Sequence, residues 1–234
     1  MASSFRGWSD ALSPTVEVAP VQLPGHETRW AEAPIPRLRP LIQLAARDLL
    51  PWLEQPFALL GLSMGALLAF ELARELRRRG APQPHHLFVA ARAAPQTHRP
   101  PRPSFALGDV AFVEKLRNLN GTPPEVLADP ELMNIMLPMV RADFEVCETY
   151  AYIHEPPLDC PITAYGGSDD DDATPDTIDA WRLQTTGRFR SRIFPGGHFF
   201  FRAMERVLIQ EVSGELRELT ASLSRQWRLN GSSY

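Results

Sequence analysis

Apolar residues form an unbroken run from Phe57 to Leu60, directly after Pro56. A short run of this kind is typical of a β-strand that is buried on both faces. From Met64 onward the apolar positions repeat with a helical period, at Ala66, Ala69, Phe70, Ala73 and Leu76. The arginines at 77–79 and then Gly80 follow, which is the order expected for a last helical turn and a left-handed C-cap. The pattern predicts a buried strand that turns sharply into a helix.

The segments before this unit alternate between helical and extended patterns. Residues 1–12 place apolar side chains at helical spacing, and residues 15–23 alternate in a way that predicts a strand ending at Pro24-Gly25. Residues 25–40 are rich in proline, arginine and glutamate and are expected to form a loop. Residues 41–53 return to helical spacing and lead into the buried strand.

Further strands and helices follow in the order of an α/β protein. Residues 85–91 predict another buried strand, with His85 and His86 exposed where the strand begins. Strands and helices that alternate with short links predict a parallel sheet with helices on both faces. Later in the chain we expect strands at 161–167 and 189–194, a helix at 177–185 and a long helix from about Arg202 to Trp227.

The turn between the buried strand and its helix reads Gly61-Leu62-Ser63-Met64-Gly65, a G-x-S-x-G motif. Chance alone gives this motif in about one chain in ten to fifteen, so its support comes from the strand before it and the helix after it. In such a turn the serine stands exposed at the end of the strand, and the flanking glycines are expected to avoid steric clashes. The amide of Met64 at the helix N-terminus can donate a hydrogen bond to an oxyanion.

A nucleophilic serine needs a base, and the base needs a carboxylate that fixes its tautomer. Two later segments follow predicted strands: the acidic turn Asp169 to Asp172 after Gly167, and His198 after Gly197. Within the turn Asp170 is favoured, because the loop first turns back over the sheet there, and Asp172 is the alternative. The four carboxylates could also be a solvated turn, and a calcium site is disfavoured because the ligand spacing of calcium loops is absent.

Residues 96–155 interrupt the α/β alternation. A proline-rich stretch is followed by helical spacing at 110–119, 130–138 and 139–152. We therefore expect an α/β core formed by residues 1–95 and 156–234, with a helical lid inserted at 96–155. Three lid residues, Met133, Met136 and Phe144, could line an apolar acyl pocket or could simply fill the core of the lid.

Composition narrows the functional classes. The 234 residues are 44% hydrophobic and 22% charged with a formal net charge of −4, which gives no electrostatic case for a nucleic-acid partner. Cys147 and Cys160 have neither metal-site nor redox-motif spacing, so we expect spare or buried thiols, with no metal and no cofactor. A signal peptide and an 18-residue apolar run are both absent from the sequence, so we expect a cytoplasmic protein without a membrane partner.

Several separated motifs together resemble one enzyme family, the type II thioesterases of polyketide and nonribosomal peptide biosynthesis. These motifs are Phe5-Arg6-Gly7-Trp8, Val21 to Gly25, Gly61 to Ala73, Gly121-Thr122-Pro123-Pro124, Arg141-Ala142-Asp143-Phe144 and Phe194 to Phe199. The resemblance implies an α/β-hydrolase with a helical lid and a triad that matches Ser63, Asp170 and His198. It also implies hydrolysis of stalled or aberrant acyl groups on the phosphopantetheine arm of acyl or peptidyl carrier proteins.

The chain departs from the family pattern in two places. Leu62 stands where the family commonly has histidine, at a position expected to point away from the chemistry. Family members also carry a strand and a Phe-Pro-x-Ala-Gly-Gly-like loop ahead of the Phe-Arg-Gly-Trp segment, and that loop holds a second oxyanion amide. We therefore expect this first strand and oxyanion loop to be missing. A carboxylesterase on small acyl esters and a carrier-binding module with impaired chemistry are the alternative functions.

Overall fold

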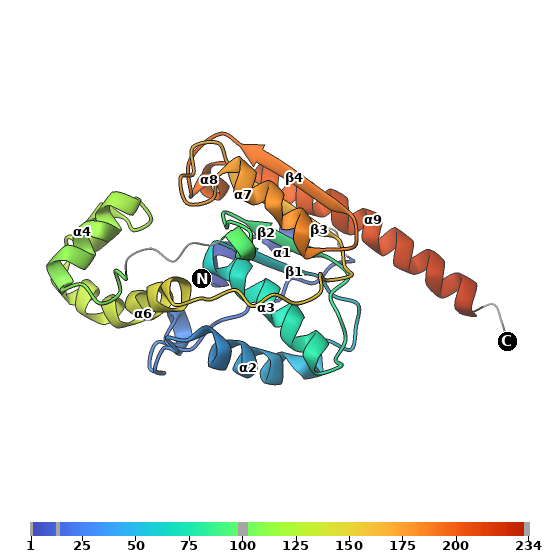
Figure 1. The fold of residues 1–234 in the computed structure, drawn as a ribbon, viewed down its shortest axis with the longest axis horizontal. Helices are drawn as coiled ribbons and strands as arrows, with labels where there is room; N and C mark the ends of the chain where they lie inside the picture. The colour runs from blue at the N-terminus through green and yellow to red at the C-terminus, as the bar shows by residue number, and fades with distance from the viewer. Residues whose placement is uncertain (1, 13–14, 98–102, 232–234) are drawn as a thin grey trace. The chain divides into compact units, whose positions relative to one another are not determined.

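The structure, a computed structural model, describes residues 2–12, 15–97 and 103–231 (Figure 1). The chain forms two compact units, one of residues 24–200 and one that combines residues 1–23 with 201–234. The first contains a four-stranded parallel sheet in the order β1-β2-β3-β4. Its strands are β1 (Leu59–Leu62), β2 (Leu87–Ala90), β3 (Ile162–Gly167) and β4 (Phe189–Phe194). The predicted parallel sheet is confirmed.

β1 lies two residues further along the chain than its apolar run predicts. Backbone pairing already begins at Phe57, whose carbonyl accepts a hydrogen bond from the amide of His85 at 2.8 Å, and continues to Ser63. Gly61 lies opposite Val89 in β2, and Val89 lies opposite Ala164 in β3. The G-x-S-x-G motif therefore begins inside the sheet.

The expectation that both histidines before β2 are exposed is wrong for one of them. His85 is exposed, but His86 is buried, and its Nε2 lies 2.9 Å from Oγ1 of Thr163 on β3. Its ring also stacks on Phe88, with the ring centroids 4.1 Å apart. The hydroxyl group from the neighbouring strand satisfies the buried ring nitrogen, which the sequence of a single strand cannot reveal.

Helices cover the sheet and share its hydrophobic core. α3 (Met64–Arg78) follows β1, and α7 (Pro175–Asp179) follows β3. Phe70 of α3 packs edge-on against Trp181, with 5.2 Å between the ring centroids. α2 (Leu38–Leu49) packs against α3 through Ile42, Ala46, Leu72 and Leu76. Gly80 ends α3 with a φ of +63° as predicted, and the Ala81 amide donates to the carbonyl of Leu76.

The segment expected to be a lid contains three helices, α4 (Asp109–Leu119), α5 (Pro124–Leu127) and α6 (Pro130–Glu148). The expected break at Pro138 is wrong, because α6 continues through this residue. An internal proline costs a helix about 3 kcal/mol, but the apolar positions on both sides of Pro138 bury one continuous face. Met133 and Leu137 before it, and Ala142 and Val146 after it, are all buried.

A buried carboxylate fixes the end of α6 to the segment that leads into α4. Glu148 is only 7% exposed, and its carboxylate accepts hydrogen bonds from the amides of Ser104 and Phe105, at 2.7 and 3.1 Å, and from the Ser104 hydroxyl. Arg37, which precedes α2, forms an ion pair with Glu145 of α6. Charged contacts therefore hold α6 from more than one side.

His26 provides another contact to α6. Its Nε2 lies 3.1 and 3.0 Å from the two carboxylate oxygens of Asp143, and its Nδ1 lies 2.9 Å from the carbonyl oxygen of Pro24. Both partners can only accept hydrogen bonds, so both ring nitrogens carry a proton when both bonds are made. Burial lowers the pKa of His26, but the hydrogen bond and charge of Asp143 outweigh it, and the net shift is upward.

We expect the contribution of the His26–Asp143 pair to stability to depend on pH. Because the pKa of His26 in the folded state lies above its ordinary value of 6.5, its contribution to stability is complete below that value and is lost as pH rises through the folded pKa. We expect the unfolding temperature of the wild type to exceed that of Asp143→Asn by more at about pH 6 than at about pH 9. Glu145→Gln, on the same helix, is the control, and its difference from wild type should not change over this range. Equal pH profiles for the two variants would contradict the prediction.

The second unit departs from the sequence pattern at three places. The expected helix over residues 1–12 is divided into η1 (Ala2–Phe5) and α1 (Trp8–Ala11) by Gly7, which has a φ of +88°. Residues 15–23 contain no strand, and Pro20 within this run cannot donate to a ladder. The expected long helix is α9 (Glu205–Gly231), preceded by the short α8 (Phe200–Ala203).

The remaining short helices are η2 (Glu27–Arg29), η3 (Leu50–Trp52), η4 (Pro95–Thr97) and η5 (Ala180–Gln184). Cys147 and Cys160 are free and half-buried. Within the described ranges, every helix is too short or too polar to cross a membrane.

Candidate active site

Ser63 lies at the junction of β1 and α3 in a strained backbone conformation. Its φ of 53° and ψ of −116° lie outside the regions that a serine ordinarily adopts, and such strain is concentrated at functional sites. Neighbouring backbone holds it there, because its amide donates to the Ala90 carbonyl at 2.8 Å and its carbonyl accepts from the Ala66 amide at 3.0 Å. The predicted sharp turn is therefore present, with the serine at its apex.

The two glycines of the motif have different roles. A Cβ atom at residue 61 would lie 2.1 Å from the carbonyl oxygen of Gly65, so only glycine fits there. A Cβ atom at residue 65 would meet no heavy atom within 4 Å apart from its chain neighbours and its own helix, so the expected steric clash with other segments is wrong for Gly65. The turn is tight because the Gly65 backbone itself approaches residue 61.

His198 reaches Ser63 from the loop that follows β4. Its Nε2 lies 2.8 Å from the Oγ atom of Ser63, across 135 residues of sequence. Two glycines make this loop possible: Gly196 has a φ of +112°, and a Cβ atom at Gly167 would lie 2.4 Å from the Gly196 carbonyl oxygen. The end of β3 and the histidine loop are thus in direct backbone contact.

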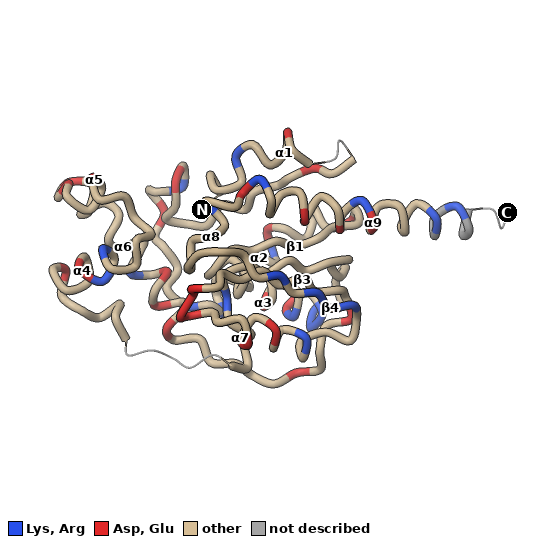
Figure 2. The backbone as a smooth tube through the Cα atoms, turned by 90° about the horizontal axis from the view of Figure 1, so that it is seen from above, with Lys and Arg blue, Asp and Glu red and all other residues tan. Residues whose placement is uncertain are grey.

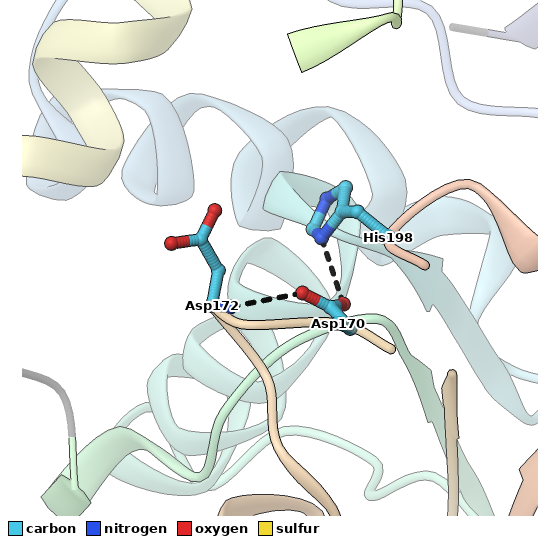
Figure 3. A group of neighbouring side chains, drawn as sticks. All are labelled: Asp170, Asp172 and His198. Atoms are coloured by element: carbon cyan, nitrogen blue, oxygen red, sulfur yellow. Dashed lines mark hydrogen bonds and ion pairs between the residues drawn. The ribbon is translucent and has the colours of Figure 1, made fainter. Parts of the chain in front are cut away.

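Asp170 occupies the other side of the His198 ring (Figure 3). Its Oδ2 atom lies 2.9 Å from Nδ1, and Oδ1 accepts hydrogen bonds from the amides of Asp172 and Ala173, at 3.0 and 3.1 Å. Because a carboxylate faces Nδ1, that nitrogen carries the proton, and Nε2 is left to accept the proton of Ser63. The three side chains therefore form one chain of hydrogen bonds.

The acidic turn places its carboxylates in unlike surroundings. Asp170 is 4% exposed, whereas Asp172 is exposed and contributes its backbone amide to Asp170 (Figure 3). Burial raises the pKa of Asp170, but the bond and charge of His198, with the two amides, outweigh it and leave the pKa below its usual value. The geometry favours Asp170 over Asp172 as the partner of His198. The turn is the longest continuous acidic run in the chain, directly after β3 (Figure 2).

One group of side chains among the described residues is close enough to share a cation, and it overlaps the same site. Atoms of Asp170, Asp172 and His198 lie within 4.8 Å of one another. Oδ2 of Asp170 and both ring nitrogens of His198 already take part in the hydrogen bonds to one another and to Ser63. These atoms are arranged for proton transfer, and the hydrogen bonds compete with a metal for them.

The remaining predicted site residues lie on two elements. Met64 is the first residue of α3, so its amide has no partner four residues earlier within the helix. Met133 and Phe144 of α6 belong to the hydrophobic cluster of α4, α5 and α6, where Phe144 packs edge-on against Phe112 at 5.2 Å. Met136 is half-buried. A place in an acyl pocket stays a prediction for all three lid residues.

Sequence reasoning missed the contacts by which Phe199 links His198 to this helical segment. The ring of Phe199 stands edge-on to that of His198, with 5.1 Å between centroids, and its tip lies against Gly121. Both residues belong to motifs visible in the sequence, Phe194 to Phe199 and Gly121 to Pro124. The two motifs indicate that both positions are important, but they do not indicate that Phe199 and Gly121 contact each other.

Comparison with known proteins gives consistent similarities. Residues 1–215 match the family model described as "Thioesterase domain". The chain is 43% identical over 220 residues to "Gramicidin S biosynthesis protein GrsT" of Aneurinibacillus migulanus, covering 94% of this chain and 86% of that protein. It is 35% identical to "Thioesterase PikA5" of Streptomyces venezuelae, covering 92% and 76%. Among solved structures, the RedJ thioesterase of the prodiginine pathway in Streptomyces coelicolor matches with a TM-score of 0.86 and 42% identity, over 92% of this chain and 85% of that one.

Proposed function

The chain belongs to the thioesterase family, and from this premise we propose that it removes acyl groups from the phosphopantetheine arms of carrier proteins. The protein is a thioester hydrolase of the α/β-hydrolase type. In our proposal Ser63 is the nucleophile, His198 the general base and Asp170 the carboxylate that orients the base. The observation that carries these roles is the continuous hydrogen-bonded chain from Asp170 through His198 to Ser63.

The first half-reaction transfers the acyl group to Ser63. His198 Nε2 accepts the hydroxyl proton as the Ser63 oxygen attacks the thioester carbonyl, and the Met64 amide donates a hydrogen bond to the developing oxyanion. The carbon–sulfur bond then breaks, and the proton held on His198 passes to the departing sulfur, which leaves as a thiol. Asp170 keeps the proton on Nδ1 throughout, so that Nε2 can accept and return the other one.

The second half-reaction releases the acid. Water enters where the thiol has left, and His198 takes one of its protons as the oxygen attacks the acyl-serine carbonyl. Collapse of this intermediate breaks the bond to Ser63, whose oxygen recovers the proton from His198. One thioester and one water molecule thus give one carboxylic acid and one thiol, and the enzyme returns to its starting state.

The carrier-bound substrate is supported by the relatives rather than by the triad, which attacks thioesters and oxygen esters alike. Two solved structures similar to this chain are the type II thioesterase BorB from the borrelidin biosynthetic cluster, at 35% identity, and YbtT, a type II thioesterase from the yersiniabactin NRPS/PKS biosynthetic pathway, at 30% identity. We therefore propose an acyl or peptidyl carrier protein as the partner, met in the cytoplasm. We also propose that residues 96–155 form a lid and that Met133, Met136 and Phe144 line the acyl channel.

Two measurements test the proposal. A fluorophosphonate should form an adduct on Ser63 that mass spectrometry can locate, and kcat/KM should be higher for an acyl-carrier protein than for a p-nitrophenyl ester of the same acid. If no adduct forms on Ser63, a carrier-binding module with impaired chemistry is favoured instead. If the ester is hydrolysed with the higher kcat/KM, the protein is better described as a carboxylesterase on small acyl esters.

A further inference from the structure

The aromatic ring of Phe199 lies between His198 and the turn that joins α4 to α5. On one side, the Phe199 ring packs edge-on against the His198 ring, with 5.1 Å between the ring centroids and an interplanar angle of 84°. On the other side, a Cβ atom at Gly121 would lie 2.4 Å from the Cζ atom of Phe199, and 3.0 and 3.2 Å from its two Cε atoms. The tip of the ring therefore packs close to the backbone of the turn, and the ring also contacts the imidazole of His198.

The backbone of Gly121 gives no reason of its own for a glycine. The glycines with positive φ among the described residues are Gly7, Gly25, Gly80 and Gly196. Gly121 is not one of them, so an alanine could adopt its conformation. A side chain at position 121 would meet the ring of Phe199, which would have to shift to make room for it. Gly108, which precedes α4, has no heavy atom within 4 Å of a Cβ position and a φ of −58°, so it provides a natural contrast in the same segment.

We propose that Phe199 is a positioning residue that links two features of the structure. One is the contact of its ring with the turn between α4 and α5, here called the Gly121 turn, and the other is the alignment of His198 with Ser63. When the turn rests on the ring, the ring is pressed against the imidazole and limits its rotation away from Ser63. When the turn lifts, the ring gains room and the base loses this support. This inference rests on the roles proposed for Ser63 and His198, and it adds a regulatory feature to the same site.

This coupling would make proton transfer from Ser63 to His198 depend on the position of the Gly121 turn. The distance from His198 Nε2 to Ser63 Oγ is 2.8 Å, and proton transfer depends strongly on such geometry. A seated turn would give an aligned base, whereas a displaced turn would leave Ser63 without an efficient base. The rate of attack on a thioester would then follow the fraction of molecules in which the turn rests on the Phe199 ring.

The test uses the full chain and four variants: Gly121→Ala, Phe199→Leu, the double variant with both changes, and Gly108→Ala. The readouts are the rate of Ser63 labelling by a fluorophosphonate, and kcat and KM for an acyl thioester of N-acetylcysteamine. We expect Gly121→Ala to lower the labelling rate and kcat about 10-fold with little change in KM. Gly108→Ala should match wild type. Leucine lacks the ring atoms that approach Gly121, so adding Gly121→Ala to Phe199→Leu should have no further effect.

Additive effects of Gly121→Ala and Phe199→Leu would overturn the coupling, as would a change in KM alone. If Gly121→Ala fails to fold, the double variant decides the question: a labelling rate equal to that of Phe199→Leu supports the coupling, and a lower rate overturns it. Fluorophosphonate labelling of the wild-type protein separates failure of the coupling from failure of the proposed function. An adduct on Ser63 with additive variants removes only the coupling, whereas no adduct removes the proposed function itself.

Discussion

Replacing Ser63 with alanine is expected to lower kcat for an acyl thioester by about 10⁵- to 10⁶-fold. The change removes the oxygen that attacks the carbonyl and that lies 2.8 Å from His198 Nε2. Among the residues that the structure describes, Ser63 is the one whose side chain is seen to bond to that nitrogen. The rate acceleration that remains would come from substrate binding and from the hydrogen bond of the Met64 amide. The variant should still fold, because alanine keeps the backbone bonds that residue 63 makes to Ala90 and Ala66.

Steady-state hydrolysis and thermal unfolding, measured side by side, check this prediction. Ser191→Ala is the matched control, since its hydroxyl lies on β4 and bonds to the exposed carboxylate of Asp179 at 3.3 Å. The control should keep its rate. If Ser63→Ala retained more than about one hundredth of the wild-type kcat with an unchanged unfolding curve, Ser63 could not be the nucleophile.

The sheet and the triad geometry could be predicted because both depend on strong local signals. β4 (Phe189–Phe194) has the predicted bounds, and β3 (Ile162–Gly167) begins one residue after its prediction. Buried parallel strands appear as short apolar runs, and their carboxyl ends meet at one edge of the sheet. A serine, an aspartate and a histidine that each follow such a strand are therefore brought together by topology alone.

Other features could not be predicted because they depend on packing between distant segments. His26 and Asp143 are 117 residues apart in sequence, and neither position has a local pattern that indicates the other. A side chain at Gly121 would displace the ring of Phe199, although the φ of Gly121 is not in the region that favours glycine. The continuity of α6 also depends on tertiary packing, because burial of one helix face offsets the helix stability that is lost at Pro138.

Asp170→Asn is expected to lower kcat about 10⁴-fold, because it reverses the tautomer of the base. The asparagine oxygen can keep the bonds from the amides of Asp172 and Ala173, which turns its NH₂ group toward Nδ1 of His198. Nδ1 must then accept a hydrogen bond, and the ring proton moves to Nε2. A protonated Nε2 cannot take the proton of Ser63, although all three side chains stay in place.

Asp172→Asn separates this effect from a general loss of negative charge in the acidic turn. It removes the same charge two residues away, but the exposed side chain of Asp172 is replaceable because its backbone amide is what bonds to Asp170. We expect its kcat to stay within about 3-fold of wild type, since surface substitutions change energies little. If both variants lost activity equally, the turn would act through its summed charge. If only Asp172→Asn lost activity, Asp172 would be the residue that orients His198.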